Sequence, residues 1–122
     1  MPVNLISPTT CNAKTSGITL ADANETNFIV NTSGGGKFIR INALYAANID
    51  GSANVDCTIK WYNAATGGTG FAIANTVTVP ADATIVMVGH DAPLYMEDNT
   101  RITVQASAGG DLTCVASYEE VS

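Results

Sequence analysis

Apolar and polar side chains alternate with a period of two along most of this chain. The pattern is clearest over residues 55–61, 102–106 and 112–118, where every second residue is apolar. Alternation of this kind places the apolar side chains on one face of a β-strand, whereas an amphipathic helix needs a period of 3.6. No segment carries a helical period of useful length, so the sequence predicts an all-β protein.

Clusters of Gly, Asn, Asp and Pro separate the alternating runs. Asp50-Gly51 is a strong hairpin signal, and Gly109-Gly110 is expected to close the last hairpin. Strands are expected over residues 15–20, 27–31, 37–45, 54–63, 72–79, 84–89, 94–96, 101–107 and 112–118. Eight or nine short strands predict an antiparallel, jelly-roll-like β-sandwich. We expect an extended N-terminal arm over residues 1–12 and a single sandwich domain over residues 13–122.

The alternation also predicts which aromatic residues face the core. In the strand expected over 37–45, Tyr45 falls on the same face as Ile39 and Ile41, and both faces of that strand are apolar. This is typical of a central strand or of one that a partner covers. Trp61 and Tyr118 likewise fall on inward faces, and Trp61 is expected to anchor the core.

The charge content is low and acidic. Charged residues make up 13% of the chain and the net charge is −6. The five basic residues are scattered: Lys14, Lys37, Arg40, Lys60 and Arg101. Nucleic-acid binding and attraction to an anionic membrane both require a basic patch, so neither is expected. A surface of small uncharged side chains is suited to lasting contact with other proteins, because such side chains lose little rotamer entropy when buried.

Targeting signals and disulfides are not expected. The N-terminal segment lacks a basic region followed by a long apolar one, and no apolar run approaches the roughly 18 residues that span a bilayer. We therefore expect synthesis in a host cytoplasm. Cys57 and Cys114 lie in apolar strand patterns and are expected to be reduced core residues, with Cys11 more exposed. One histidine and three separated cysteines do not make a zinc site.

A catalytic site is not expected either. His90 precedes Asp91, and such a pair can act as a base with its orienting carboxylate when a nucleophile is near. No G-x-S-x-G motif is present, so ordinary turn chemistry is the favoured interpretation. The sequence predicts a protein that is not an enzyme, with no catalytic residues, cofactor or metal.

Three further segments have weak binding signatures. Oxygen-bearing side chains alternate around Gly51 from Asn48 to Asp56, as in a calcium loop, but the bidentate glutamate is missing. The acidic segment 97–99 reads as a solvated turn, with calcium a distant second. Glycines 34–36 precede a strand and not a helix, which argues against phosphate binding.

Tyr62 and Tyr95 are the aromatic residues expected on the outside, and they give thin support for sugar stacking.

The second half of the chain resembles small virion structural proteins of tailed bacteriophages, most nearly a capsid decoration or cement protein. The resemblance covers about residues 37–120 and lies in the segments VPA (79–81), PLYMEDNTRITVQASA (93–108) and VASYEE (115–120). It implies a compact sandwich on the outer surface of the capsid, bound to the major capsid protein, and a homo-oligomer, either trimer or dimer. The alternatives are a neck, tail or fibre component and, less favoured, a carbohydrate-binding adhesion module.

Overall fold

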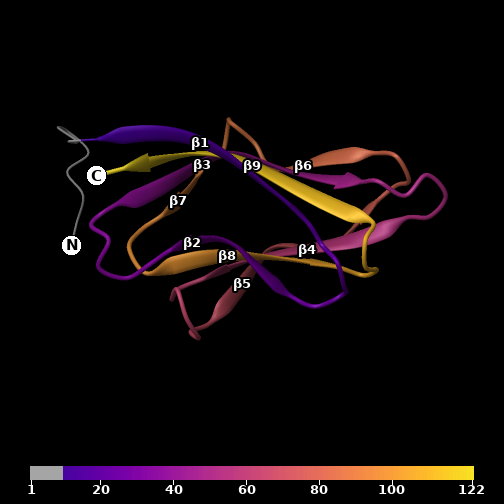
Figure 1. The fold of residues 1–122 in the computed structure, drawn as a ribbon, viewed down its shortest axis with the longest axis horizontal. Coiled ribbons are helices and arrows are strands. Elements are labelled where there is room, and N and C mark those ends of the chain that lie inside the picture. The colour runs from indigo at the N-terminus through magenta and orange to yellow at the C-terminus, as the bar shows by residue number, and fades with distance from the viewer. Residues whose placement is uncertain (1–9) are drawn as a thin grey trace.

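The computed structural model describes residues 10–122, which form nine β-strands (Figure 1). The strands are β1 (Cys11–Thr19), β2 (Thr26–Asn31), β3 (Phe38–Asn48), β4 (Val55–Tyr62), β5 (Gly70–Val79), β6 (Thr84–Val88), β7 (Leu94–Met96), β8 (Thr100–Ala106) and β9 (Leu112–Val121). The predicted all-β fold is confirmed. None of the described residues forms a helix long and apolar enough to cross a membrane. The arm expected over residues 1–12 falls mainly outside the described residues, and its last two residues belong to β1.

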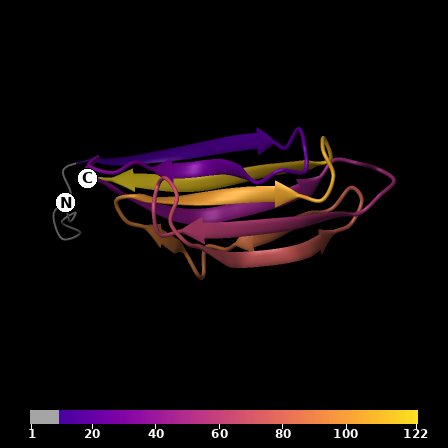
Figure 2. The same ribbon diagram turned by 90° about the horizontal axis from the view of Figure 1, so that it is seen from below.

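The strands form two antiparallel sheets that stack face to face, seen edge-on in Figure 1 and face-on in Figure 2. Sheet A has the order β1-β9-β3-β6, with β7 also paired to β3, and sheet B has the order β2-β8-β4-β5. The first part of β3 pairs with β7 and its second part with β6, so these two short strands share one edge in succession. With β6 and β7 counted as one position, each sheet has four strand positions. Their order and connections are those of a jelly roll.

Most connections cross from one sheet to the other. Among the nine described strands, only β4 and β5 are consecutive strands that pair as a hairpin. The turn at Asp50-Gly51 joins β3 of sheet A to β4 of sheet B, and the turn at Gly109-Gly110 joins β8 to β9 across the sandwich. The two predicted hairpins are therefore wrong. A turn signal specifies that the chain reverses, but it does not specify which sheet the next strand joins.

The last of these crossings passes close to the β1–β2 loop. Gly110 N–H donates to the carbonyl oxygen of Leu20 at 2.7 Å. A Cβ atom added at Gly109 would lie 2.6 Å from the carbonyl oxygen of Ala21, which is inside any normal contact distance. A glycine at position 109 thus lets two loops pack backbone to backbone at this end of the sandwich.

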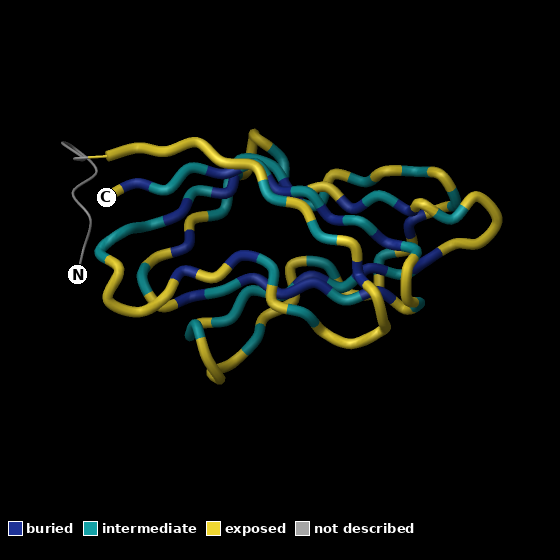
Figure 3. The backbone as a smooth tube through the Cα atoms, in the orientation of Figure 1, coloured by how far each residue is buried: buried dark blue, intermediate teal, exposed yellow. Residues whose placement is uncertain are grey.

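The core lies between the two sheets and is lined by inward residues of β2 to β9, with Ile18 of β1 packed against its margin (Figure 3). Cys57 of β4 and Cys114 of β9 are fully buried and free. Their thiols meet across the core, and this hydrogen-bonded contact together with burial raises the pKa of the Cys114 thiol far above its usual range. The prediction that both are reduced core residues is confirmed.

A β-bulge in β3 changes the inward set of that strand. The pairing with β9 shifts between Ile41 and Ala43, so one extra residue enters the strand there. Ile39 and Ile41 are buried, but after the bulge Leu44 is completely buried and Tyr45 is 38% exposed. The assignment of Tyr45 to the core was wrong, because one inserted residue reverses every side chain that follows it.

The predictions for Tyr118 and Trp61 have different outcomes. Tyr118 is buried at the inner face of β9. Trp61 faces inward from the last part of β4 but is only partly buried, and its ring lies 5.9 Å from that of the exposed Phe71. Trp61 therefore packs against the margin of the core and not at its centre.

Candidate interaction surface

The structure does not assemble the residues that suggested catalysis. His90 and Asp91 are both exposed in the turn between β6 and β7. A backbone hydrogen bond from Ala92 N–H to the carbonyl oxygen of Gly89 closes this turn at 3.1 Å. Within residues 10–122 no hydrogen bond links His90 to Asp91 or to a serine, so the pair has the features of an ordinary turn.

The polar side chains of the calcium-like segment 48–56 form hydrogen bonds that hold neighbouring loops together. The buried Asn48 Nδ2 donates to the carbonyl oxygens of Ala53 at 2.8 Å and Val79 at 3.0 Å. Asn48 Oδ1 accepts from Asp50 N–H, and Asp50 Oδ1 accepts from Ser52 N–H and Oγ. The hydrogen bonds from Ser52 lower the pKa of Asp50. These oxygens point to local backbone donors, and no group of metal ligands converges among the described residues.

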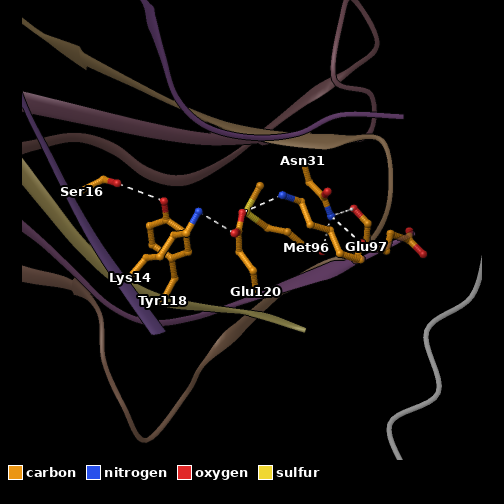
Figure 4. Close-up of polar contacts among 8 residues, drawn as sticks. Lys14, Ser16, Asn31, Met96, Glu97, Tyr118 and Glu120 are labelled. Atoms are coloured by element: carbon orange, nitrogen blue, oxygen red, sulfur yellow. Dashed lines mark hydrogen bonds and ion pairs between the residues drawn. The ribbon is translucent and has the colours of Figure 1, made fainter. Parts of the chain in front are cut away.

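The acidic segment 97–99 serves the opposite end of the sandwich in the same way. Asn31 is buried, and its Nδ2 donates to the carbonyl oxygens of Lys37, Met96 and Glu97 at 3.0–3.1 Å (Figure 4). Asp98 Oδ2 accepts from Gly34 N–H at 3.0 Å, so this carboxylate closes the glycine-rich turn. Segment 97–99 is therefore a structural turn between β7 and β8.

Tyr62, one of the two tyrosines expected outside, is not free to stack on a sugar. Its hydroxyl donates to the carboxylate of Glu25 at 2.8–2.9 Å, and this contact raises the pKa of Tyr62. The guanidinium carbon of Arg101 lies 3.9 Å from its ring centroid. Gly70 lies against the same ring, since a Cβ there would be 2.7 Å from it. Both the ring and the hydroxyl are therefore occupied inside the chain.

Arg101 and Glu25 build the polar centre of the outer face of sheet B. Arg101 Nη1 donates to the carbonyl oxygens of Ala64 and Gly67, both at 2.8 Å, which fixes the β4–β5 loop. Burial acts to raise the pKa of Glu25, but hydrogen bonds from Thr103 and Tyr62 outweigh it and lower that pKa. These groups are engaged in hydrogen bonds within the chain, and the surface that they form is polar.

A shallow hollow of about 150 Å³ lies farther along this same face. It is lined by Asp56, Thr58, Thr76, Gln105, Ala106 and Ser107. Several of the polar groups are already engaged: Thr78 Oγ1 donates to Asp56 Oδ1, and Thr58 Oγ1 accepts from Thr76 N–H. The hollow has no aromatic wall.

The outer face of sheet A has a different character. A row of four residues crosses four of its five strands in register: Gly17 of β1, Val115 of β9, Tyr45 of β3 and Val86 of β6. Val86 is 56% exposed and Tyr45 38%. The rows on either side carry small residues, namely Thr15, Ser117 and Ala43 on one side and Thr19, Thr113, Ala47 and Thr84 on the other. We call this apolar row with its two flanking rows the sheet A face.

Two charged residues, Arg40 of β3 and Glu119 of β9, lie at one margin of this face. Arg40 and Glu119 are partners in the β3–β9 register, beside Tyr95 of β7, which is 57% exposed. The ring of Phe38 lies 6.0 Å from that of Tyr95. Tyr95 is thus outside, as predicted, and it extends the exposed apolar area. The centre of the face has no charged side chain in its three rows.

Sequence reasoning did not find the sheet A face, because the bulge in β3 hid it. Simple alternation assigns Tyr45 to the inward face of its strand. Under that assignment the apolar row of the sheet A face lacks its middle residue. The available signal was the double apolar character of residues 38–45, which predicts a strand covered on both faces.

Comparisons with known proteins bear on the fold. The sequence matches no protein-family model and no curated protein. A protein of the Bacillus endospore appendages, described as a family of disulfide-linked pili, is similar in structure with a TM-score of 0.55. The match covers 100% of this chain and 96% of that chain at 14% sequence identity. This protein therefore has the fold of a known pilus subunit.

Chains of viral particles give weaker similarities. One from infectious bursal disease virus has a TM-score of 0.42 and 11% identity, over 99% of this chain and 35% of that chain. One from the extra small virus of the giant freshwater prawn has a TM-score of 0.33 and 13% identity, over 99% of this chain and 85% of that chain.

Proposed function

We propose that this chain is a non-enzymatic structural protein of a phage virion, which decorates the capsid by binding the major capsid protein through the sheet A face. The observation that carries the proposal is the apolar row of half-buried Val115 with exposed Tyr45 and Val86 among small uncharged residues. The resemblance of residues 37–120 to capsid decoration proteins supports the location on the outer capsid surface.

The physical properties of the face fit attachment to a protein lattice. Its rows hold Thr, Ser, Ala and Gly side chains, which cost little entropy and no ion desolvation when a partner covers them. The aromatic ring of Tyr45 gives a contact with both an apolar body and a hydroxyl, as is common at interfaces. Repetition of a modest contact over many lattice sites provides avidity without a single strong site.

The proposal is tested by adding purified protein to capsids that lack it and measuring the bound fraction. We expect Val86→Glu to weaken binding roughly tenfold or more, because it places a charge at the most exposed position of the apolar row. The matched control is Ile73→Glu, since Ile73 is also an exposed apolar residue but lies in β5 of sheet B, away from the sheet A face.

Cryo-electron microscopy of the parent particle gives the location. Density for the chain on the outside of the capsid supports decoration. Density confined to the neck, tail or fibres would overturn the capsid assignment. Equal binding of Val86→Glu and wild type would overturn the role of the sheet A face.

A filament subunit is the second candidate. It is favoured by the fold similarity to the endospore appendage protein, which extends over nearly the whole of both chains. Negative-stain microscopy of the purified protein at high concentration distinguishes the two candidates. Regular filaments formed without capsids favour the second, and discrete particles favour the first.

A further inference from the structure

The free edge of sheet A is formed by β1, which pairs with β9 alone. Thr10 and Ser122 exchange two backbone hydrogen bonds, at 3.0 and 2.9 Å, and Leu20 N–H donates to the carbonyl oxygen of Leu112 at 3.0 Å. The register between these two points is continuous. Hydrogen-bonded pairs alternate along an antiparallel ladder, so the even-numbered residues of β1 bond to β9.

The odd-numbered residues of β1 consequently direct their backbone groups away from the sheet. They are Cys11, Ala13, Thr15, Gly17 and Thr19. Each has one N–H and one C=O facing outward. No described strand pairs with this edge, and most of β1 is exposed along its length (Figure 3).

The other three edges of the sandwich are irregular. Strand β2 has a bulge between Asn27 and Ile29. The pairing of β5 with β4 shifts at two places, and Thr76 there has a φ of 48°. The fourth edge is divided between β6, with five residues, and β7, with three. Bulges and short strands are devices that prevent an edge from pairing with another chain. Among the described strands, β1 alone forms a long edge without such a device.

Charge does not protect β1 either. Lys14 is its one charged residue, and its Nζ lies 2.7 Å from a Glu120 oxygen on the neighbouring strand. Glu120 also binds Lys37 at 2.8 Å. The one charge on β1 is thus held in an ion pair with the neighbouring strand. The net charge of −6 opposes self-association elsewhere on the surface, but the odd-numbered row of β1 contains no charged residue.

We propose that β1 pairs antiparallel with β1 of a second copy, so that sheet A continues across a two-fold axis at Thr15. In this register Ala13 lies opposite Gly17 and Cys11 opposite Thr19. All five outward residues then form hydrogen-bonded pairs, with their side chains on one face of the joined sheet. Lys14 lies opposite Ser16 of the other copy, so no like charges are directly opposed.

A second copy is favoured as the occupant because this strand is complementary to itself. Small residues meet small residues at every hydrogen-bonded pair, and a two-fold contact uses the same patch on both copies. The seam is only one strand wide, which predicts a weak dimer that dissociates on dilution. This inference does not depend on the proposed attachment to a capsid, since the seam uses the β1 edge and not the centre of the sheet A face.

The test is sedimentation velocity of the purified full chain over a wide concentration range. We expect a monomer–dimer equilibrium whose dissociation constant rises roughly tenfold or more in Ala13→Pro. The Ala13 N–H faces away from β9, so the proline removes an intermolecular hydrogen bond without breaking one inside the chain. A second variant, Thr15→Lys, places a charge at the seam, and Asn75→Lys on the exposed part of β5 is its matched control.

Residue-level amide exchange identifies the surface. At high concentration we expect added protection at Ala13, Thr15 and Gly17, whereas Lys14 and Ser16 are already protected by β9. A protein that stays monomeric at all concentrations would overturn the proposal. So would a dimer that both seam variants leave intact, because its contact would lie elsewhere. If Ala13→Pro fails to fold, Thr15→Lys against Asn75→Lys decides the question alone.

Discussion

The carboxylate of Glu120, near the end of β9, lies 2.7 Å from the Nζ of Lys14 on β1 (Figure 4). The other oxygen of this carboxylate binds Lys37, which precedes β3. One acidic side chain of β9 therefore binds both the edge strand β1 and the residue that precedes β3. The hydrogen bonds from Lys14 and Lys37 lower the pKa of Glu120 below its usual range.

This contact predicts a pH-dependent stability. Because the pKa of Glu120 is lower in the folded state than in the unfolded state, its contribution is present at neutral pH. It is lost as the pH falls from about 4.5 through the lowered pKa. We expect Glu120→Gln to reduce the melting temperature by a few degrees at pH 7 and to have a smaller effect at pH 3. Thermal unfolding followed by circular dichroism at both pH values measures this.

Glu97→Gln is the control for that prediction. Glu97 is exposed and makes no ion pair among the described residues, so its replacement should have little effect at either pH. An effect of Glu120→Gln that is equal at both pH values would show that shape and not charge is responsible.

Thiol accessibility distinguishes the three cysteines. Cys11 is exposed, and Cys57 and Cys114 are buried against each other. We expect one of the three thiols to react rapidly with a disulfide reagent in the native protein and all three to react in denaturant. Cys11→Ser should remove the rapid reaction. Rapid reaction of two or three thiols without denaturant would contradict the packing of β4 against β9.

Neighbouring residues on either side of the β3 bulge give opposite predictions. Leu44→Ala deletes a fully buried side chain and should destabilise the protein by about 2–5 kcal/mol. Tyr45→Ala removes an outward-facing ring and should cost less than about 1 kcal/mol. Urea unfolding of the two variants measures both values. The reverse order would mean that β3 has no bulge and that simple alternation holds.

The close approach of two loops predicts that Gly109 tolerates no side chain. Gly109→Ala forces a methyl group against the backbone of Ala21, and we expect a loss of about 1–3 kcal/mol. Gly35→Ala is the matched control, because a Cβ there meets its nearest atom at an ordinary 3.5 Å. Urea unfolding of both variants provides the measurement. Equal stability of the two would contradict the packing of the β8–β9 turn on the β1–β2 loop.

Most of the fold was readable from alternation, because a half-buried strand repeats every two residues. All nine strands were found, and Cys57, Cys114 and Tyr118 were placed correctly in the core. The start of β1 was missed by four residues, since its side chains are nearly all exposed and carry no alternation. A strand held by backbone hydrogen bonds leaves little trace in the pattern of side chains.

The candidate surface was harder to predict, for two physical reasons. A bulge inserts one residue without changing composition, so Tyr45 could not be separated from the inward set before the register with β9 was known. The cross-strand row also joins Gly17, Val115 and Val86 from distant parts of the chain. Such a row depends on strand order, and turn signals such as Asp50-Gly51 do not reveal strand order.

The division of one edge of β3 between β6 and β7 has a consequence for how far assembly through strand edges can proceed. A subunit with regular edges on both sides of a sheet is bivalent and can polymerise without limit. Here the β6–β7 edge of sheet A is interrupted, so the β1 edge is the one edge of the sheet that can pair with a second copy. Growth by edge pairing therefore terminates at two copies, and any larger array must be organised by a template or by contacts made through the faces of the sandwich.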